Sequence, residues 1–281
     1  MAQPNMTRGT TKNDIPFLRL EGGPKTAMMW SGGPGNAIVS GWLLNSFLKP
    51  FYPILEEYTL IMLTRRSDLT DGYTTKMMAD DYAELIKAEY GGHVDLIIGG
   101  SYGGIVAQHF AADYPDLYDY LVISAAAWKV SDIGKEGDYR FAELLNQNKP
   151  RQAWGSMAGA LASGPVAIAL MRPLLWLMGP SMIGDQYTDR FRQDVLLEAK
   201  AEVAHDGRES LKRIIKPTLI QAGEHDKYFP LDLFHETAEL IPNGNGKLVV
   251  YEGIGHNIFT DEKIARDILN WVGETEKNLR A

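Results

Sequence analysis

A serine between glycines is the strongest chemical signal in this sequence. Gly99-Gly100-Ser101-Tyr102-Gly103 follows an apolar stretch at residues 94–98 and precedes a stretch of helical character at residues 102–113. A G-x-S-x-G motif between a strand and a helix forms a sharp turn that strains the serine backbone and exposes its hydroxyl. A Cβ at Gly99 or Gly103 would collide with the neighbouring strand and helix. The motif therefore predicts that Ser101 is a nucleophile.

A serine nucleophile needs a histidine as its base and a carboxylate that orients the histidine. The sequence contains six histidines. His256 stands in the loop after the apolar stretch 247–251, which places it at the same edge of a sheet as Ser101. The nearest rival, His225, shares a loop with the candidate acids. We therefore predict that His256 is the base.

Two acidic residues follow the apolar stretch 217–221 and compete for the orienting role. They are Glu224 and Asp226, which stand just before a helix expected at residues 230–240. The other loop that could carry an acid, after residues 120–124, begins with three alanines and a tryptophan. Asp226 is the preferred acid, and Glu224 is the alternative.

The oxyanion that forms when a serine attacks a carbonyl needs preorganised N–H donors. One donor is expected from Tyr102, the residue directly after the nucleophile. The other is expected from Ser31-Gly32-Gly33-Pro34-Gly35, which follows the apolar stretch 25–30. Gly33 is the preferred donor in this segment, because Pro34 has no N–H.

The elements that must position these residues alternate between strands and helices. Short apolar stretches separated by helical ones indicate a parallel sheet that is covered by helices on both faces. The expected strands are residues 25–30, 58–64, 94–98, 120–124, 217–221 and 247–251, and the expected helices are residues 75–90, 102–113, 230–240 and 261–275.

The alternation stops between residues 129 and 216, where no strand is predicted. We interpret residues 1–128 and 215–281 as a core domain, and residues 129–214 as a helical cap that covers Ser101 as a lid. Trp176 and Met171 are predicted to bind the apolar portion of a substrate. The expected helices of the cap are residues 139–146, 151–161, 166–177 and 186–205, and its other apolar candidates are Leu161, Ile168, Leu174, Leu175 and Met178.

Two pairs of charged residues could also meet a substrate. Arg65 and Arg66 follow the stretch 58–64 and could bind an anion, although a structural role in the loop is the preferred interpretation. Glu198 and Glu202 are one helical turn apart in the cap and could receive a substrate ammonium group. A solvated helix face is the preferred interpretation for this second pair.

The composition excludes several classes of protein. The chain has 281 residues, no cysteine and a net charge of −8, which argues against a disulfide scaffold, a thiolate metal site and nucleic-acid binding. No metal-ligand cluster or phosphate loop is found, so neither a metal nor a cofactor is expected. No signal peptide is visible, and glycine, serine and proline interrupt the uncharged stretch 152–171. We therefore expect a cytoplasmic protein without a membrane span, of undetermined oligomeric state.

These motifs resemble those of the α/β-hydrolase superfamily over nearly the whole chain. The triad order serine, aspartate, histidine is typical of that superfamily. Residues 30–35 and 99–103 are similar to the prolyl iminopeptidase motifs H-G-G-P-G and G-G-S-W-G, with Ser31 in place of the histidine and Tyr102 in place of the tryptophan. Residues 64–68 depart from the usual D-x-R-G and read T-R-R-S-D. The resemblance implies an α/β fold, with a mostly parallel central sheet flanked by helices and a helical cap inserted after the sixth strand.

The combined pattern predicts a serine hydrolase that cleaves a carboxylic ester or a lactone through an acyl-enzyme intermediate. The expected partner is a small-molecule ester with an apolar portion. A proline-iminopeptidase-like aminopeptidase and a cofactor-free perhydrolase are the alternatives within the fold. A ligand receptor built on a hydrolase fold is a third hypothesis, from a different class of protein.

Overall fold

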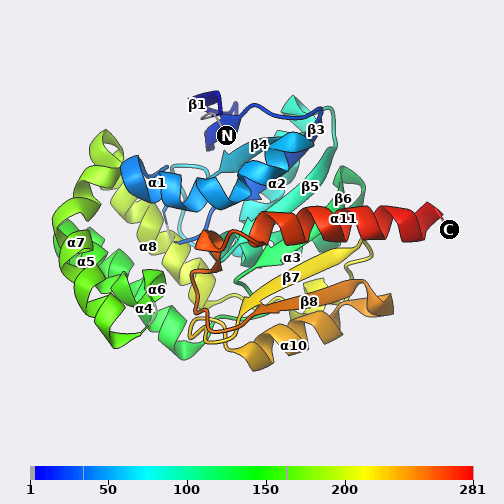
Figure 1. The fold of residues 1–281 in the computed structure, drawn as a ribbon. Helices are drawn as coiled ribbons and strands as arrows, with labels where there is room; N and C mark the ends of the chain where they lie inside the picture. The colour runs from blue at the N-terminus through cyan, green and yellow to red at the C-terminus, as the bar shows by residue number, and fades with distance from the viewer. Residues whose placement is uncertain (1–3, 34, 163, 281) are drawn as a thin grey trace.

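The computed structural model describes residues 4–33, 35–162 and 164–280. An eight-stranded sheet in the order β1-β2-β4-β3-β5-β6-β7-β8 runs through the molecule (Figure 1). The pairs β1-β2 and β2-β4 are antiparallel, and the other neighbours are parallel. All six predicted strands are present within two residues at each end. The strands are β1 Met6–Thr10, β2 Pro16–Leu20, β3 Lys25–Trp30, β4 Tyr58–Leu63, β5 Val94–Gly100, β6 Tyr118–Ser124, β7 Thr218–Gly223 and β8 Gly246–Tyr251.

The first two strands were not predicted from the sequence. β1 is an edge strand with four exposed residues out of five, so it carries no apolar pattern that would identify it. Backbone pairing with β2 holds it in place, from Met6 opposite Leu20 to Thr10 opposite Pro16. Such strands depend on their neighbour rather than on their own composition.

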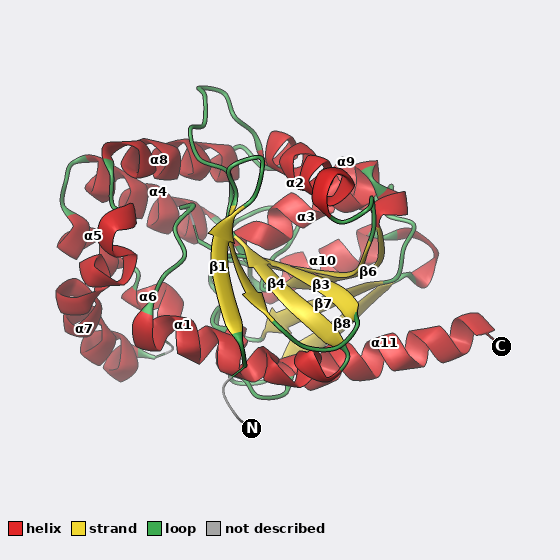
Figure 2. Ribbon diagram, turned by 90° about the horizontal axis from the view of Figure 1, so that it is seen from above, coloured by secondary structure: helices red, strands yellow, loops and turns green. Residues whose placement is uncertain are grey.

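Helices cover both faces of the sheet, and Figure 2 shows α1 and α11 on one side and α2 and α3 on the other. Along β5, Ile97 packs into the core on the α3 side, and Ile98 packs into the core on the α11 side. An internal parallel strand is apolar on both faces for this reason. The core helices are α1 Gly41–Leu48, α2 Thr75–Glu89, α3 Tyr102–Asp113, α10 Leu231–Leu240 and α11 Ile264–Arg280, and the 3-10 helix η1, Lys49–Glu56, continues α1.

Between β6 and β7, the described residues form helices and no strand. Helices α4 to α8 gather at one end of the sheet (Figure 1), whereas the short α9 packs on α3 and α10 of the core. All of these helices lie within residues 129–214, which we call the cap. α4 packs against α8, and α5 packs against α7. The cap helices are α4 Asp132–Asn146, α5 Pro150–Ser156, α6 Ala158–Leu161, α7 Pro165–Ile183, α8 Asp189–Val203 and α9 Arg208–Leu211.

The helix α7 is longer and more apolar than the sequence pattern suggested. The glycines and serines that interrupt the uncharged stretch all precede it, and the helix continues through Pro173 and Pro180. Residues 165–186 have a mean hydropathy of 1.5 in their most apolar window, so by length and composition alone they could cross a membrane. In this structure α7 is an outer helix of the cap that packs on α5 and α6, with Arg172 in its middle.

Candidate active site

Ser101 lies at the sharp turn between the end of β5 and the start of α3. Its backbone has φ 49° and ψ −115°, a left-handed conformation that is costly for a residue with a side chain. The N–H of Ser101 donates to the carbonyl of Ser124 in β6 at 2.8 Å, which helps to hold the strained residue. A Cβ on Gly103 would stand 2.2 Å from the carbonyl oxygen of Trp30, so the turn needs glycine there. The predicted strand, turn and helix are present, with the strain at the serine.

Ser101, His256 and Asp226 are brought together from three loops. Ser101 Oγ lies 2.9 Å from His256 Nε2, and His256 Nδ1 lies 2.8 Å from Asp226 Oδ2. The other oxygen of Asp226 accepts hydrogen bonds from the N–H groups of Tyr228 and Phe229, at 2.8 and 3.0 Å. A fixed carboxylate of this kind orients the imidazole, so that Nε2 can accept the serine proton.

Glu224, the alternative acid, is placed differently. Its carboxylate accepts a hydrogen bond from the N–H of Gly253 at 2.8 Å. It therefore braces the loop after β8 instead of orienting His256.

His256 lies in an enclosed and largely aromatic environment. The ring of Tyr228 stacks on the imidazole at a centroid distance of 4.8 Å, and the ring of Phe229 lies at 5.8 Å. Burial by itself would lower the pKa of His256, but the Asp226 carboxylate outweighs this effect and the pKa is raised. The neutral form that accepts a proton is lost as the pH falls through this raised pKa. The geometry therefore supplies a base that functions above that pH.

The glycine-rich segment after β3 approaches Ser101 closely. A Cβ on Gly32 would stand 2.9 Å from the Cβ of Ser101, so only glycine fits there. Gly33 also lines the cavity beside Ser101, and Pro34 lies outside the described residues. Tyr102 is at the N-terminus of α3, where helix N–H groups have no partner within the helix. Gly33 and Tyr102 thus remain the predicted oxyanion donors.

A buried ion pair holds the glycine-rich segment against the cap. Arg65, in the loop after β4, donates from Nε to Glu198 Oε2 in α8 at 2.9 Å, and both side chains are 1% exposed or less. The guanidinium also donates to the carbonyls of Ser31 at 2.7 Å, Gly33 at 2.6 Å and Gly35. The N–H of Gly35 donates in turn to Glu198. The pair therefore fixes both ends of the expected oxyanion loop.

The expectation of a solvated face for Glu198 and Glu202 is wrong, because both residues are buried. They lie on the same face of α8 as Phe191 and Val195, which pack into the cap. This periodicity was visible in the sequence and could have revealed the burial. The preferred structural interpretation of the arginines agrees with the contacts, since Arg66 pairs with Asp81 at 3.3 Å.

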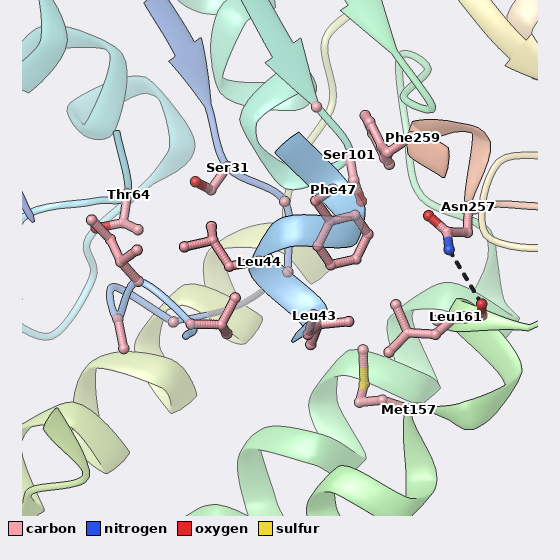
Figure 3. Close-up of a pocket in the computed structure, with 18 of the residues that line it drawn as sticks. Ser31, Leu43, Leu44, Phe47, Thr64, Ser101, Met157, Leu161, Asn257 and Phe259 are labelled. Atoms are coloured by element: carbon pink, nitrogen blue, oxygen red, sulfur yellow. Dashed lines mark hydrogen bonds between the residues drawn. The ribbon is translucent and has the colours of Figure 1, made fainter. Parts of the chain in front are cut away.

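A pocket opens from Ser101 between the core and the cap (Figure 3). Its walls are mostly apolar. A hydrogen bond from Asn257 Nδ2 to the carbonyl of Leu161, at 3.3 Å, joins the loop after β8 to the cap at its rim (Figure 3). The wall from the cap includes Phe141, Trp154, Met157, Ala160, Leu161 and Phe191, and the wall from the core includes Leu43, Leu44, Phe47, Met62 and Phe259.

The prediction that Trp176 and Met171 line the pocket differs from the structure. Both residues belong to α7, and among the described residues neither lies on the pocket wall. Trp176 is 42% exposed and stacks beneath the guanidinium of Arg151 at 4.8 Å. Met171 packs inside the cap. Leu161 is the one apolar candidate of the cap that reaches the pocket within the described part of the chain. α7 packs outside α5 and α6, and of its described residues only the last, Ile183, lies on the pocket wall.

The sequence matches a family model and is similar to a curated protein. Residues 61–263 match a family model described as alpha/beta hydrolase fold. A bifunctional esterase/perhydrolase from Acinetobacter calcoaceticus is 26% identical over 94% of this chain and 98% of that protein.

Solved structures of the same fold cover almost the whole chain. An alpha/beta hydrolase enzyme from a Medee basin deep-sea metagenome library has a TM-score of 0.74 at 19% identity and covers 95% of this chain and 97% of its own. A thermophilic esterase from Thermogutta terrifontis has a TM-score of 0.71 at 22% identity, over 96% and 98% of the two chains. The family model spans most of the chain, and the sheet order and the turn at Ser101 fit the same fold: the chain belongs to the α/β-hydrolase family.

Proposed function

We propose that this protein is a serine esterase. Ser101 Oγ attacks the carbonyl carbon of a carboxylic ester, and His256 takes the serine proton. The N–H groups of Gly33 and Tyr102 bind the oxyanion, where loss of one donor costs about 3–4 kcal/mol in comparable enzymes. His256 then protonates the leaving alcohol, which departs and leaves an acyl group on Ser101. A water, deprotonated by His256, attacks the acyl carbon and releases the acid and the free serine.

The observation that carries this proposal is the relay from Ser101 through His256 to Asp226 at the mouth of an apolar pocket. The apolar walls favour an ester with an apolar portion, and a lactone fits the same chemistry. Two of the similar proteins reported above are named as esterases, which supports the same reaction class. The aminopeptidase alternative is less well supported, because Glu198, one of the two cap carboxylates expected to receive a substrate ammonium group, already pairs with Arg65.

A perhydrolase is the second candidate, because the relative from Acinetobacter calcoaceticus is named as both an esterase and a perhydrolase. In that reaction hydrogen peroxide replaces water as the attacking molecule and the acyl-enzyme yields a peracid. Peracid formation from a short ester and peroxide, measured beside hydrolysis, tests this candidate.

A substrate panel tests the reaction class. We expect turnover of p-nitrophenyl esters, and little or no turnover of the matching p-nitroanilides, because an amine is a poorer leaving group. A fluorophosphonate probe should label Ser101, as located by peptide mass spectrometry, and should abolish esterase activity in proportion to labelling. Rapid cleavage of proline anilide without ester cleavage would contradict the proposal in favour of the aminopeptidase.

The cap wall should determine the preferred length of the apolar chain. Leu161→Ala enlarges the pocket, so the optimum in a p-nitrophenyl series from acetate to decanoate is expected to shift towards longer chains. Removing one or two buried methylene contacts corresponds to a change in relative kcat/KM of about 10-fold. Trp176→Ala is the matched control in the cap, and its chain-length profile should equal that of the wild type. A shifted profile in the control together with an unchanged profile in Leu161→Ala would refute the assignment of the wall.

A further inference from the structure

One carboxylate in the pocket wall is not used by the proposed reaction. Asp138, in α4, lines the pocket together with apolar residues of the cap, and it is 3% exposed. Its Oδ1 is buried and accepts no hydrogen bond from a donor group of the described residues, and the same holds for Oε2 of the acid Glu202 in α8. A buried carboxylate oxygen without a partner is unfavourable, and native structures contain few of them. A proton shared with Glu202 can satisfy one oxygen of Asp138, and the other oxygen is left without a donor among the described residues.

The Asp138 carboxyl faces a second buried acid. Glu202 in α8 is 1% exposed, and the two carboxyl groups lie within hydrogen-bonding reach of each other. Two carboxylates at such a distance cannot both be ionised in a buried site, so they share a proton. Burial raises the pKa of Asp138 to about 6, and burial and Asp138 together raise the pKa of Glu202 well above its ordinary value. The pair therefore holds one proton between its two carboxyl groups.

The charged groups around the pair do not neutralise Asp138. Arg65 is a cation that acts on both carboxyls, and it is already paired with Glu198 on α8. From the core side the pair is faced by His256 and by the phenol of Tyr228, which is not ionised. The pair therefore leaves one negative charge, with one free oxygen, in an otherwise apolar wall.

We propose that Asp138 accepts a hydrogen bond from a donor group on the substrate, either a hydroxyl or a protonated amine. This inference rests on the proposed function, because it specifies the substrate that the same pocket takes. Gly137, the residue before Asp138 in α4, packs on the hydroxyl of Tyr228, and the ring of Tyr228 stacks on His256, so the donor lies on the His256 side of the pocket. The substrate is then an ester with an apolar portion and one polar donor, rather than a simple aliphatic ester.

The test uses esters that differ only at the end of the chain. One series of p-nitrophenyl esters has acyl chains of four to eight carbons that end in methyl, hydroxyl or ammonium. A second series of butyrate esters carries the same three groups on the alcohol. For at least one chain length in one of the two series, we expect kcat/KM for a donor-ended ester to exceed that of the methyl-ended ester by about 10-fold or more. The difference should come from a lower KM.

Variants of the pair distinguish a ligand site from a structural contact. Asp138→Leu removes the acceptor, so the preference for the donor-ended ester should fall to about 1. Asp138→Asn keeps an oxygen acceptor but no charge, so it should keep a preference for a hydroxyl and lose one for an ammonium, which separates the two sources. Glu202→Gln still offers an N–H to Asp138 and should retain the preference. Glu143→Gln, at an exposed position of α4, is the matched control.

The outcomes separate this inference from the proposed function. No preference for a donor at any length in either series, or an equal preference in wild type and Asp138→Leu, would overturn the role of Asp138. If Asp138→Leu does not fold, the comparison of hydroxyl and ammonium esters in Asp138→Asn decides. Failure of the wild type to cleave any methyl-ended ester would instead overturn the esterase proposal. In that case, calorimetric titration of the Ser101→Ala protein still measures the donor preference. The ligands are methyl esters of the same acyl chains, and the comparison is between the affinities of the donor-ended and the methyl-ended chains.

Discussion

Ser101→Ala should lower kcat for a short p-nitrophenyl ester by about 10⁶-fold, the loss found when the triad serine is removed from a serine protease. Without the hydroxyl no acyl-enzyme can form, and only binding and the oxyanion donors remain to assist direct attack by water. Alanine has the same Cβ as serine, so the variant should keep the strained turn at residue 101 and lose only the hydroxyl. Steady-state kinetics and the loss of fluorophosphonate labelling measure the effect.

Ser31→Ala is the matched control for that experiment. Ser31 lines the same pocket, but its hydroxyl donates to the carbonyl of Leu63 at 2.9 Å and is not paired with a base. Loss of one such hydrogen bond costs about 1 kcal/mol of stability, so activity should fall by less than about 10-fold. Equal losses in the two variants would contradict the assignment of Ser101 as the nucleophile. Retention of full activity by Ser101→Ala would do the same.

Arg65→Met should lower the free energy of unfolding by about 3–5 kcal/mol, because it leaves the Glu198 carboxylate buried without its partner. It should also lower kcat more than it raises KM. The guanidinium holds the carbonyls of Ser31, Gly33 and Gly35, and these residues belong to the segment that should bind the oxyanion. Urea unfolding and steady-state kinetics on short esters, at a temperature where the variant is folded, measure the two effects separately.

Two further variants test whether the ion pair itself is responsible. The double variant Arg65→Met, Glu198→Met removes both charges and should be more stable than Arg65→Met alone, since no unpaired charge remains. Its kcat should stay low, because the carbonyls of Ser31, Gly33 and Gly35 still lack the hydrogen bonds that Arg65 donates. Arg66→Met is the control, since Arg66 is 37% exposed and its pair with Asp81 should contribute about 1 kcal/mol or less. A double variant with wild-type kcat would show that Arg65 does not position the loop.

The contacts of Arg65 also connect the cap to the chemistry. Tyr102, the residue after the proposed nucleophile, places its ring 4.7 Å from the Arg65 guanidinium and donates its hydroxyl to the carbonyl of Glu198 at 2.8 Å. One buried pair thus touches the loop after β3, the start of α3 and the cap helix α8. In this arrangement the cap is more than a cover over the pocket, because it helps to hold both groups of expected oxyanion donors.

The residues of the relay could be identified from the sequence because each depends on local pattern and chain order. An apolar run followed by Gly-x-Ser-x-Gly and a helical stretch can form few structures other than a strand, a tight turn and a helix. The carboxyl ends of parallel strands meet at one edge, so loops after β7 and β8 had to bring Asp226 and His256 towards Ser101. The sheet and the helices that flank it followed from the same alternation.

Which face of each cap helix meets the pocket was decided only by the tertiary structure. A helix that is apolar all round, such as α7, gives no sign of which side packs inwards, so the sequence could not show that Trp176 lies outside. The pocket is lined instead by residues such as Leu161 of α6. The burial of Arg65, Glu198 and Asp138 depends on partners that are far away in the sequence, since only a matching charge or a shared proton makes such burial tolerable. Local pattern and chain order determined which residues we propose as the reacting groups. Long-range packing determined the shape of the pocket and the charges that hold it.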